Sequence, residues 1–253
     1  MFEIADIKQR IQLELTKGHG VVFADELGRL QQFDPDLTQT EQQKFDRVRI
    51  ADQRRLHALG RGLVRYLLDL PSGDFCTGQS GKPYAPDAPS FNISHAGQMI
   101  VVALHAQLPV GVDIETQTRH IHDGGLIKRV CHQEEAHWIA QQDERSQALA
   151  FLRCWVRKEA VLKAMGTGLI DALHTINTNL QETSPVLSAP CDLRLWDFPE
   201  MFSSDPGTLA IDPRVKRVTF LSTSMVTTMM QPEQNTPAQA TLESYETHHE
   251  NRN

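Results

Sequence analysis

The chain has 253 residues, of which 40% are hydrophobic and 23% charged, with a formal net charge of −7 at pH 7. This composition is typical of a folded protein with one large or two modest domains, and the acidic balance argues against nucleic-acid or anionic-membrane binding. The first residues, MFEIADIKQR, do not resemble a signal peptide, and the nearly apolar run 99–112 is too short to span a bilayer. We therefore expect a cytoplasmic protein.

The stretch 41–69 has a helical pattern. Its apolar residues recur at spacings of three and four and form one stripe. The other face is basic and carries Lys44, Arg47, Arg49, Arg54, Arg55, Arg61 and Arg65. Such a face is either simply solvated or binds an anion, and the local positive excess in an acidic chain keeps the second interpretation open.

Residues 71–89 are rich in glycine and proline and are predicted to form a loop. Strands are expected at 99–105 and 110–115, helices at 134–142 and 146–165, and further strands at 173–180, 193–198, 215–221 and 225–230. The polar stretch 231–253 has one aromatic residue, Tyr245, and is predicted to be disordered. The pattern indicates an α+β protein with two similar halves, residues 1–111 and 112–230, followed by this tail.

Two carboxylates follow one another on the strand predicted at 110–115. Asp113 and Glu115 are two positions apart, so their side chains point to the same face. Two adjacent carboxylates repel each other unless a cation separates them. A divalent ion such as Mg²⁺ fits this need, because it prefers oxygen ligands and often also contacts substrate phosphates. A lone D-x-E pair is also common on exposed strands.

A second group of polar residues lies on the helix predicted at 146–165. Trp155, Glu159 and Lys163 are spaced by four and line nearly one face. Glu159 and Lys163 are either a surface ion pair or a third metal carboxylate one turn from a phosphate-binding cation. The segments Ser80-Gly-Lys-Pro-Tyr84 and Phe91-Asn-Ile-Ser-His95 add Lys82, Ser94 and His95 as candidates, with turn formation or packing as the alternative roles.

The order of these segments is more specific than any one of them. GKP, FN-x-SH, VGxDxE, and W-x-x-KEA-x-x-K followed by G-x-GL occupy positions 82 to 169. This succession resembles the 4′-phosphopantetheinyl transferases of the larger, monomeric, surfactin-synthetase-activating type. The resemblance implies Mg²⁺-dependent transfer of 4′-phosphopantetheine from coenzyme A to a serine of an acyl or peptidyl carrier protein, with release of adenosine 3′,5′-bisphosphate. Mn²⁺ is the alternative ion.

The resemblance also assigns roles by position. Asp113, Glu115 and Glu159 match the metal-binding acids, and Lys163 matches the lysine on the pyrophosphate, with Lys158 as its basic neighbour. The coenzyme A site is assigned to Asn92, Ser94, His95, Lys82 and Lys44, the last two near the 3′-phosphate. Some members carry a second cation where this chain has Glu41, so that contact is expected to be missing. Val156 replaces a smaller or hydroxylated residue, which predicts only a packing difference.

The implied fold has two α/β halves related by a pseudo-twofold axis, with coenzyme A and metal between them and a monomer as the expected state. Either Glu159 or a water polarised by the metal would take the serine proton. Two other functions stay open: a different Mg²⁺-dependent phosphoryl or nucleotidyl transferase, and a carrier-binding module without catalysis. The first is disfavoured because the sequence contains no Walker A motif: Pro83 follows Gly81-Lys82 where that motif needs Ser or Thr. The second is disfavoured because all three acids and Lys163 are present.

Overall fold

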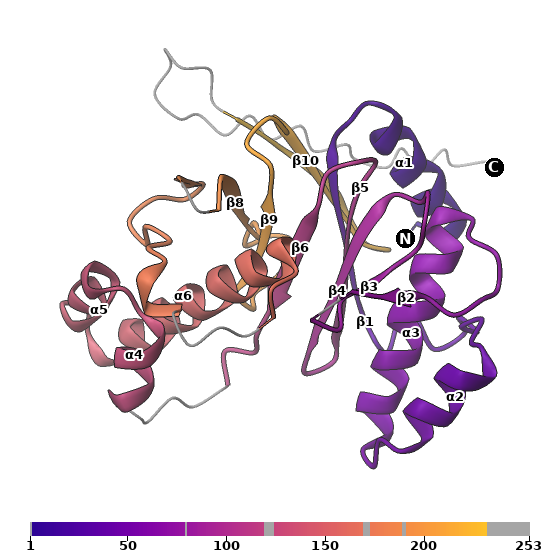
Figure 1. Ribbon diagram of the computed structural model, residues 1–253, viewed down its shortest axis with the longest axis horizontal. Helices are drawn as coiled ribbons and strands as arrows, with labels where there is room; N and C mark the ends of the chain where they lie inside the picture. The colour runs from indigo at the N-terminus through magenta and orange to yellow at the C-terminus, as the bar shows by residue number, and fades with distance from the viewer. Residues whose placement is uncertain (1, 79, 119–123, 169–172, 189–190, 232–253) are drawn as a thin grey trace, which may run out of the picture.

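The computed structural model describes residues 2–78, 80–118, 124–168, 173–188 and 191–231 (Figure 1). The first part contains α1 (Ile4–Thr16), β1 (Gly20–Glu26), α2 (Gln39–Asp46), α3 (Ala51–Leu68), β2 (Cys76–Thr77), β3 (Pro83–Tyr84), β4 (Ser90–Ala96) and β5 (Met99–His105). The second part contains β6 (Val110–Ile114), α4 (Gly124–Val130), α5 (Gln133–Ala140), α6 (Glu144–Met165), η1 (Leu173–Thr175), β7 (Val186–Leu187), β8 (Leu193–Asp197), β9 (Gly207–Ile211), β10 (Arg217–Leu221) and β11 (Val226–Met230). This mixture of helices and strands agrees with the predicted α+β class.

The first sheet has five strands in the order β11-β10-β1-β5-β4. The pair β1–β10 is parallel, and the other neighbouring pairs are antiparallel. Helices α1 and α3 lie on one side of this sheet (Figure 1). They pack on alternate residues of the inner strands, among them Phe23 of β1 and Val102 of β5, because successive side chains of a strand point to opposite faces.

The second sheet has four strands in the order β6-β9-β8-β7, and α6 lies on its outer side (Figure 1). Its inner face meets the first sheet in a shared core. Val22 of β1 and Val101 of β5 pack there with Val112 of β6, Leu209 of β9 and Phe220 of β10. Strands β1 and β5 are therefore buried on both faces, which explains why they are apolar along nearly their whole length.

The two sheets do not coincide with the predicted halves of the chain, residues 1–111 and 112–230. The change from one sheet to the other does fall between β5 and β6, close to the predicted boundary. Strands β10 and β11, however, return to the first sheet, where β10 pairs with β1. The second sheet is therefore formed by strands between β6 and β9 alone, whereas the predicted second half extends to residue 230.

Several expected elements are confirmed, with small differences at their ends. They are the strands at 99–105, 110–115, 193–198, 215–221 and 225–230 and the helices at 134–142 and 146–165. The stretch 41–69 is corrected to two helices, because the backbone at Ile50 is extended (φ −82°, ψ 119°). The run 173–180 is corrected from a strand to a short 3₁₀ helix and turns, and the predicted loop 71–89 contains the β2–β3 hairpin.

Helix α1 and strand β4 were not predicted. Ser94 and His95 lie within β4. The prediction for the tail concerns residues of which 232–253 lie outside the described part of the chain. Among the described residues, none of the helices combines the length and the apolar composition that crossing a bilayer requires.

Candidate active site at the junction of the two sheets

A glycine on β6 allows α6 to lie directly against this strand. A Cβ atom at Gly111 would lie 2.0 Å from the carbonyl oxygen of Ala160 and 2.2 Å from the amide nitrogen of Ala164. Any other residue would force the helix away from the sheet. Glu159 and Lys163 directly precede these two alanines on α6. The close approach of helix and strand therefore sets the distance of both residues from the acidic end of β6.

Asp113 is the centre of the site. Its side chain is buried, and Oδ1 accepts a hydrogen bond of 2.8 Å from the hydroxyl of Ser94 on β4. The Nζ atom of Lys163 on α6 lies 2.5 Å from the same oxygen and 3.1 Å from Ser94 Oγ. The structure thus brings together three predicted site residues from three elements, and these elements belong to both sheets.

The environment of Asp113 makes an uncompensated negative charge costly. Burial raises the pKa of this carboxyl group above its ordinary value, and the charge of Glu115 raises it further. The Lys163 ammonium and the Ser94 hydroxyl act in the opposite direction without cancelling the burial. A cation beside Asp113 therefore stabilises the ionised form, and Lys163 supplies that cation in this structure.

The three acids predicted to bind the metal provide the right kind of donor for a hard divalent ion. Asp113 is the fourth residue of β6, Glu115 directly follows the strand, and Glu159 lies one turn before Lys163 on α6. Their carboxylates do not form a compact group of three in this structure. Among the described residues, the compact group of possible ligand atoms consists of Cys131, Glu135 and Cys154.

A cluster of aromatic and basic side chains lies beside His95. The His95 ring packs edge-on against His57 of α3, with ring centroids 4.6 Å apart, and His57 stacks on Phe45 of α2 at 5.7 Å. Burial lowers the pKa of His95 to about 4, and the neighbouring His57 and Lys163 contribute in the same direction. The pKa of His57 is also lowered, by burial and then by Lys44 and Arg61. The positive charges of Lys44 and Arg61 beside His57 can attract an anion.

His57 was not among the predicted site residues. The sequence does contain a signal for it, because Arg54, His57 and Arg61 are spaced to share one face of α3. Lys44, which was predicted, is exposed on α2 and contributes to the electrostatic environment of His57. The predicted basic face is used partly for internal contacts, since Arg55 donates to backbone carbonyls of residues 30, 31 and 33.

Glu41 has a structural role in this arrangement. It is buried, its carboxylate lies 2.8 Å from the Arg65 guanidinium, and it forms a capping box with Thr38 at the start of α2. The Glu41 side chain is therefore directed toward the protein interior.

Asn92 and Lys82 hold the backbone at the junction. The side-chain oxygen of Asn92 accepts a hydrogen bond of 2.8 Å from the Val112 amide, which fastens β4 to β6. Lys82 Nζ donates to the carbonyl oxygens of Val110 and Lys163, at 2.7 and 2.6 Å. Burial lowers the pKa of Lys82 to about 8. Both residues were predicted to contact coenzyme A, and in the structure these polar atoms are bonded to protein backbone.

The ammonium of Lys158, which was predicted to belong to the coenzyme A site as the basic neighbour of Lys163, is directed away from the junction. Its side chain is almost completely buried, and Nζ lies 2.8 Å from Glu135 of α5 and donates to the carbonyls of Leu173 and Ile176. Burial opposes ionisation of Glu135, but Lys158 and two hydrogen bonds from Thr178 hold its pKa below the ordinary value. This buried ion pair fastens the segment after η1 to α5 and α6.

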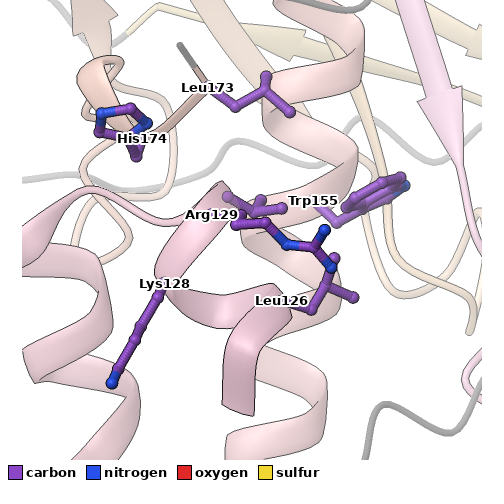
Figure 2. A pocket seen from close by; sticks show the side chains of 7 residues that line it. Leu126, Lys128, Arg129, Trp155, Leu173 and His174 are labelled. Atoms are coloured by element: carbon purple, nitrogen blue, oxygen red, sulfur yellow. The ribbon is translucent and has the colours of Figure 1, made fainter. Parts of the chain in front are cut away.

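A pocket of about 450 Å³ lies between α4, α6 and η1 (Figure 2). Its apolar side chains include Leu126, Leu173 and Trp155, and Trp155 lies one turn before Glu159 on α6. Figure 2 shows Arg129 extended toward Leu126 and Trp155, whereas Lys128 points away from Trp155. The charged groups that line this pocket are basic, so it favours anionic over cationic groups.

Comparisons with known proteins agree with the motifs at the junction. The sequence model of the 4′-phosphopantetheinyl transferase superfamily matches residues 109–199. The chain is 30% identical over 159 residues to the 4′-phosphopantetheinyl transferase gsp of Aneurinibacillus migulanus, covering 60% of this chain and 65% of that protein. It is 31% identical over 145 residues to a 4′-phosphopantetheinyl transferase of Bacillus subtilis, covering 54% and 63%. The resemblance to the 4′-phosphopantetheinyl transferase superfamily is confirmed.

A longer alignment covers more of both chains. The 4′-phosphopantetheinyl transferase HetI of a Nostoc species is 27% identical over 196 residues, or 72% of this chain and 81% of that protein. The chain spans slightly less than two thirds of the two relatives named first. The superfamily match includes Asp113, Glu115, Glu159 and Lys163, whereas Ser94 and His95 precede it. Leu169, the last residue of the predicted motifs, lies outside the described residues.

Proposed function

We propose that this chain is a 4′-phosphopantetheinyl transferase that uses coenzyme A to convert an apo-carrier protein into its holo form. The observation that carries this proposal is the contact of Lys163 and Ser94 with Asp113 at the junction of the two sheets. It combines an acid for a metal with a cation for a phosphate, and all of the acids predicted for this chemistry lie on β6 or α6 or next to them. The superfamily match and the similar enzymes support the proposal.

In the proposed reaction, the carrier serine attacks the phosphorus that bears pantetheine, and the bond from that phosphorus to the leaving adenosine 3′,5′-bisphosphate breaks. Mg²⁺ or Mn²⁺ held by Asp113, Glu115 and Glu159 would neutralise charge on the pyrophosphate. Lys163 provides a second positive charge beside Asp113, where charge on the leaving oxygen develops. Its side chain is part-exposed, so the ammonium can turn from the carboxylate toward a phosphate.

The His57–His95 cluster is proposed to bind the 3′-phosphate together with Lys44. The positive charges of Lys44 and Arg61 act on His57, and a phosphate in this cluster would compensate them. For the serine proton, Glu159 is the candidate base on this chain, and the acceptor is otherwise a water molecule. We also propose that the enzyme is a monomer, with the units β1-β5-β4 plus α3 and β6-β9-β8 plus α6 related by a pseudo-twofold axis.

The decisive test is the intact mass of apo acyl and peptidyl carrier proteins incubated with this protein, coenzyme A and Mg²⁺. One phosphopantetheine group should be added, and a carrier with the acceptor serine changed to alanine should stay unmodified. A nucleotidyl transferase would add a different mass, and a carrier-binding module would bind without changing the mass. No gain of phosphopantetheine on any apo-carrier, with binding or without it, would contradict the proposal.

A further inference from the structure

Lys82 joins the two elements that carry the reactive groups. Its Nζ atom lies between the carbonyl oxygen of Val110, the first residue of β6, and the carbonyl oxygen of Lys163 on α6. The lysine itself precedes β3, in the hairpin that follows α3. A residue remote from both elements in the sequence is therefore hydrogen-bonded to each of them.

The contact with α6 is made where a helix needs partners. The last backbone carbonyl groups of a helix have no N–H donor within the helix, and a positive charge is favourable at that end. Lys82 satisfies the carbonyl of Lys163, and the hydroxyl of Ser80 donates to the carbonyl of Gly166. The hairpin 76–84 thus caps α6 from outside, and Gly81 has the positive φ of +83° that its turn requires.

The contact with β6 links this cap to the acid. Val110 is three residues before Asp113, and the side chains of Asp113 and Lys163 meet at 2.5 Å. The Lys82 ammonium therefore holds the backbone at the start of β6 and the backbone of Lys163 on α6. Gly111 sets the spacing between α6 and β6. Lys82 sets the position of the helix along the strand.

We propose that Lys82 is a positioning residue that holds Asp113 and Lys163 at their working distance and that it is not a ligand of the coenzyme A 3′-phosphate. This inference rests on the proposed function. The part-buried position of these two hydrogen bonds supports it, because an ammonium with limited access to water is stabilised by its two carbonyl acceptors. A ligand of the 3′-phosphate would have to give up at least one of these hydrogen bonds or share the third N–H.

The two roles predict different kinetics with coenzyme A and with dephospho-coenzyme A, which lacks the 3′-phosphate. A positioning role predicts that Lys82→Ala lowers kcat on the order of a hundredfold with both substrates, because small displacements of reacting groups cost that much. The ratio of the two KM values should stay as in the wild type. A higher KM for coenzyme A alone, with dephospho-coenzyme A unaffected, or a wild-type kcat, would overturn the inference.

Two further variants separate positioning from a general loss of structure. Lys82→Gln keeps two N–H donors without a charge, and we expect it to recover part of the lost kcat. Ser80→Ala removes the neighbouring cap of α6 but no contact with β6, and its kcat should stay within about twofold of the wild type. Loss of kcat in Ser80→Ala equal to that in Lys82→Ala would show that only the helix end matters and would contradict the bridging role.

Hydrogen exchange provides a measurement that does not depend on activity. Lys82→Ala should exchange faster than the wild type in peptides that cover both the end of α6 and β6, whereas Ser80→Ala should do so only at the end of α6. If the wild-type protein modifies no carrier, the proposed function fails, and this comparison still tests whether Lys82 joins the two elements. Unchanged exchange in β6 of Lys82→Ala would contradict the inference.

Discussion

Lys163 and Asp113 meet at 2.5 Å, although one lies near the end of a helix and the other on a strand fifty positions earlier. The carboxylate is nearly buried, while the side chain of the lysine is 28% exposed. The two partners therefore differ in what they lose when the contact breaks. Lys163 can return to water, but Asp113 would be left as a buried negative charge.

This difference yields the first prediction, for Asp113→Asn. The folded state raises the pKa of Asp113, so its charge is a cost to folding at pH 7, and the neutral amide removes that cost. We expect the Tm without added divalent ion to be equal to or above that of the wild type, while transfer falls on the order of 10²–10³-fold. Calorimetry and the carrier mass assay measure the two effects. Wild-type activity in a folded Asp113→Asn protein would show that Asp113 binds no essential metal.

The second prediction tests the buried role of Lys158. Lys158→Met leaves Glu135 as a buried charge without its partner, which should lower the free energy of unfolding by roughly 3–5 kcal/mol. The matched control is Lys128→Met, because Lys128 is exposed on α4 and should have almost no effect. Urea denaturation measures both. The KM for coenzyme A should not change in Lys158→Met. An increase in this KM without loss of stability would show that Lys158 belongs to the coenzyme A site.

Glu41 provides the third prediction. Restoring a cation at this position, as Glu41→Lys, should not improve coenzyme A binding, because the new ammonium would lie against Arg65 and Arg61. We expect a loss of roughly 3–5 kcal/mol of stability from the broken buried pair. Gln43→Lys, on an exposed position of the same helix, is the control and should leave the stability nearly unchanged. A tighter coenzyme A complex of a stable Glu41→Lys protein would refute this reasoning.

The fourth prediction concerns stability in acid. The folded state lowers the pKa of His95 from 6.5 to about 4, so between these values the unfolded chain binds more protons than the folded one. Stability from this group is complete above pH 6.5 and is lost as the pH falls toward 4. His95→Gln cannot titrate, and its free energy of unfolding should therefore fall less steeply with pH across this range. Urea titrations between pH 4.5 and 7 compare the slopes, and parallel curves would contradict the assignment.

The elements that could be predicted from the sequence are those whose apolar pattern and ends are marked by residues close by in the chain. Strand β5 and strand β6 are short apolar runs between turn signals, and α6 has both a clear length and glycines after its end. The break between α2 and α3 could not be seen in the same way, because the apolar spacing continues across it. In the run 173–180, the Thr178 amide and hydroxyl bond to Glu135, and this distant partner replaces the neighbour that a strand would need.

For the site, sequence motifs indicated the residues but not what each polar atom contacts. Ser94, Asp113 and Lys163 were predicted separately, and the structure brings them together. Lys158 and Lys82 belong to the same motifs, yet one ammonium is buried against Glu135 and the other bonds to backbone carbonyls. A motif fixes the residue type at a position, whereas the direction of a long side chain depends on acceptors elsewhere in the fold.

The pairing of β1 with β10 has a consequence for how the chain folds during synthesis. Strand β1 lies in the middle of its sheet, but its parallel neighbour begins at Arg217, after the whole second sheet has been made. A nascent chain that ends near residue 111 therefore presents one open edge of β1, with Val21, Val22 and Phe23 at the positions that β10 later pairs. Completion of the first sheet therefore waits for β10 and β11, which are synthesised after all four strands of the second sheet.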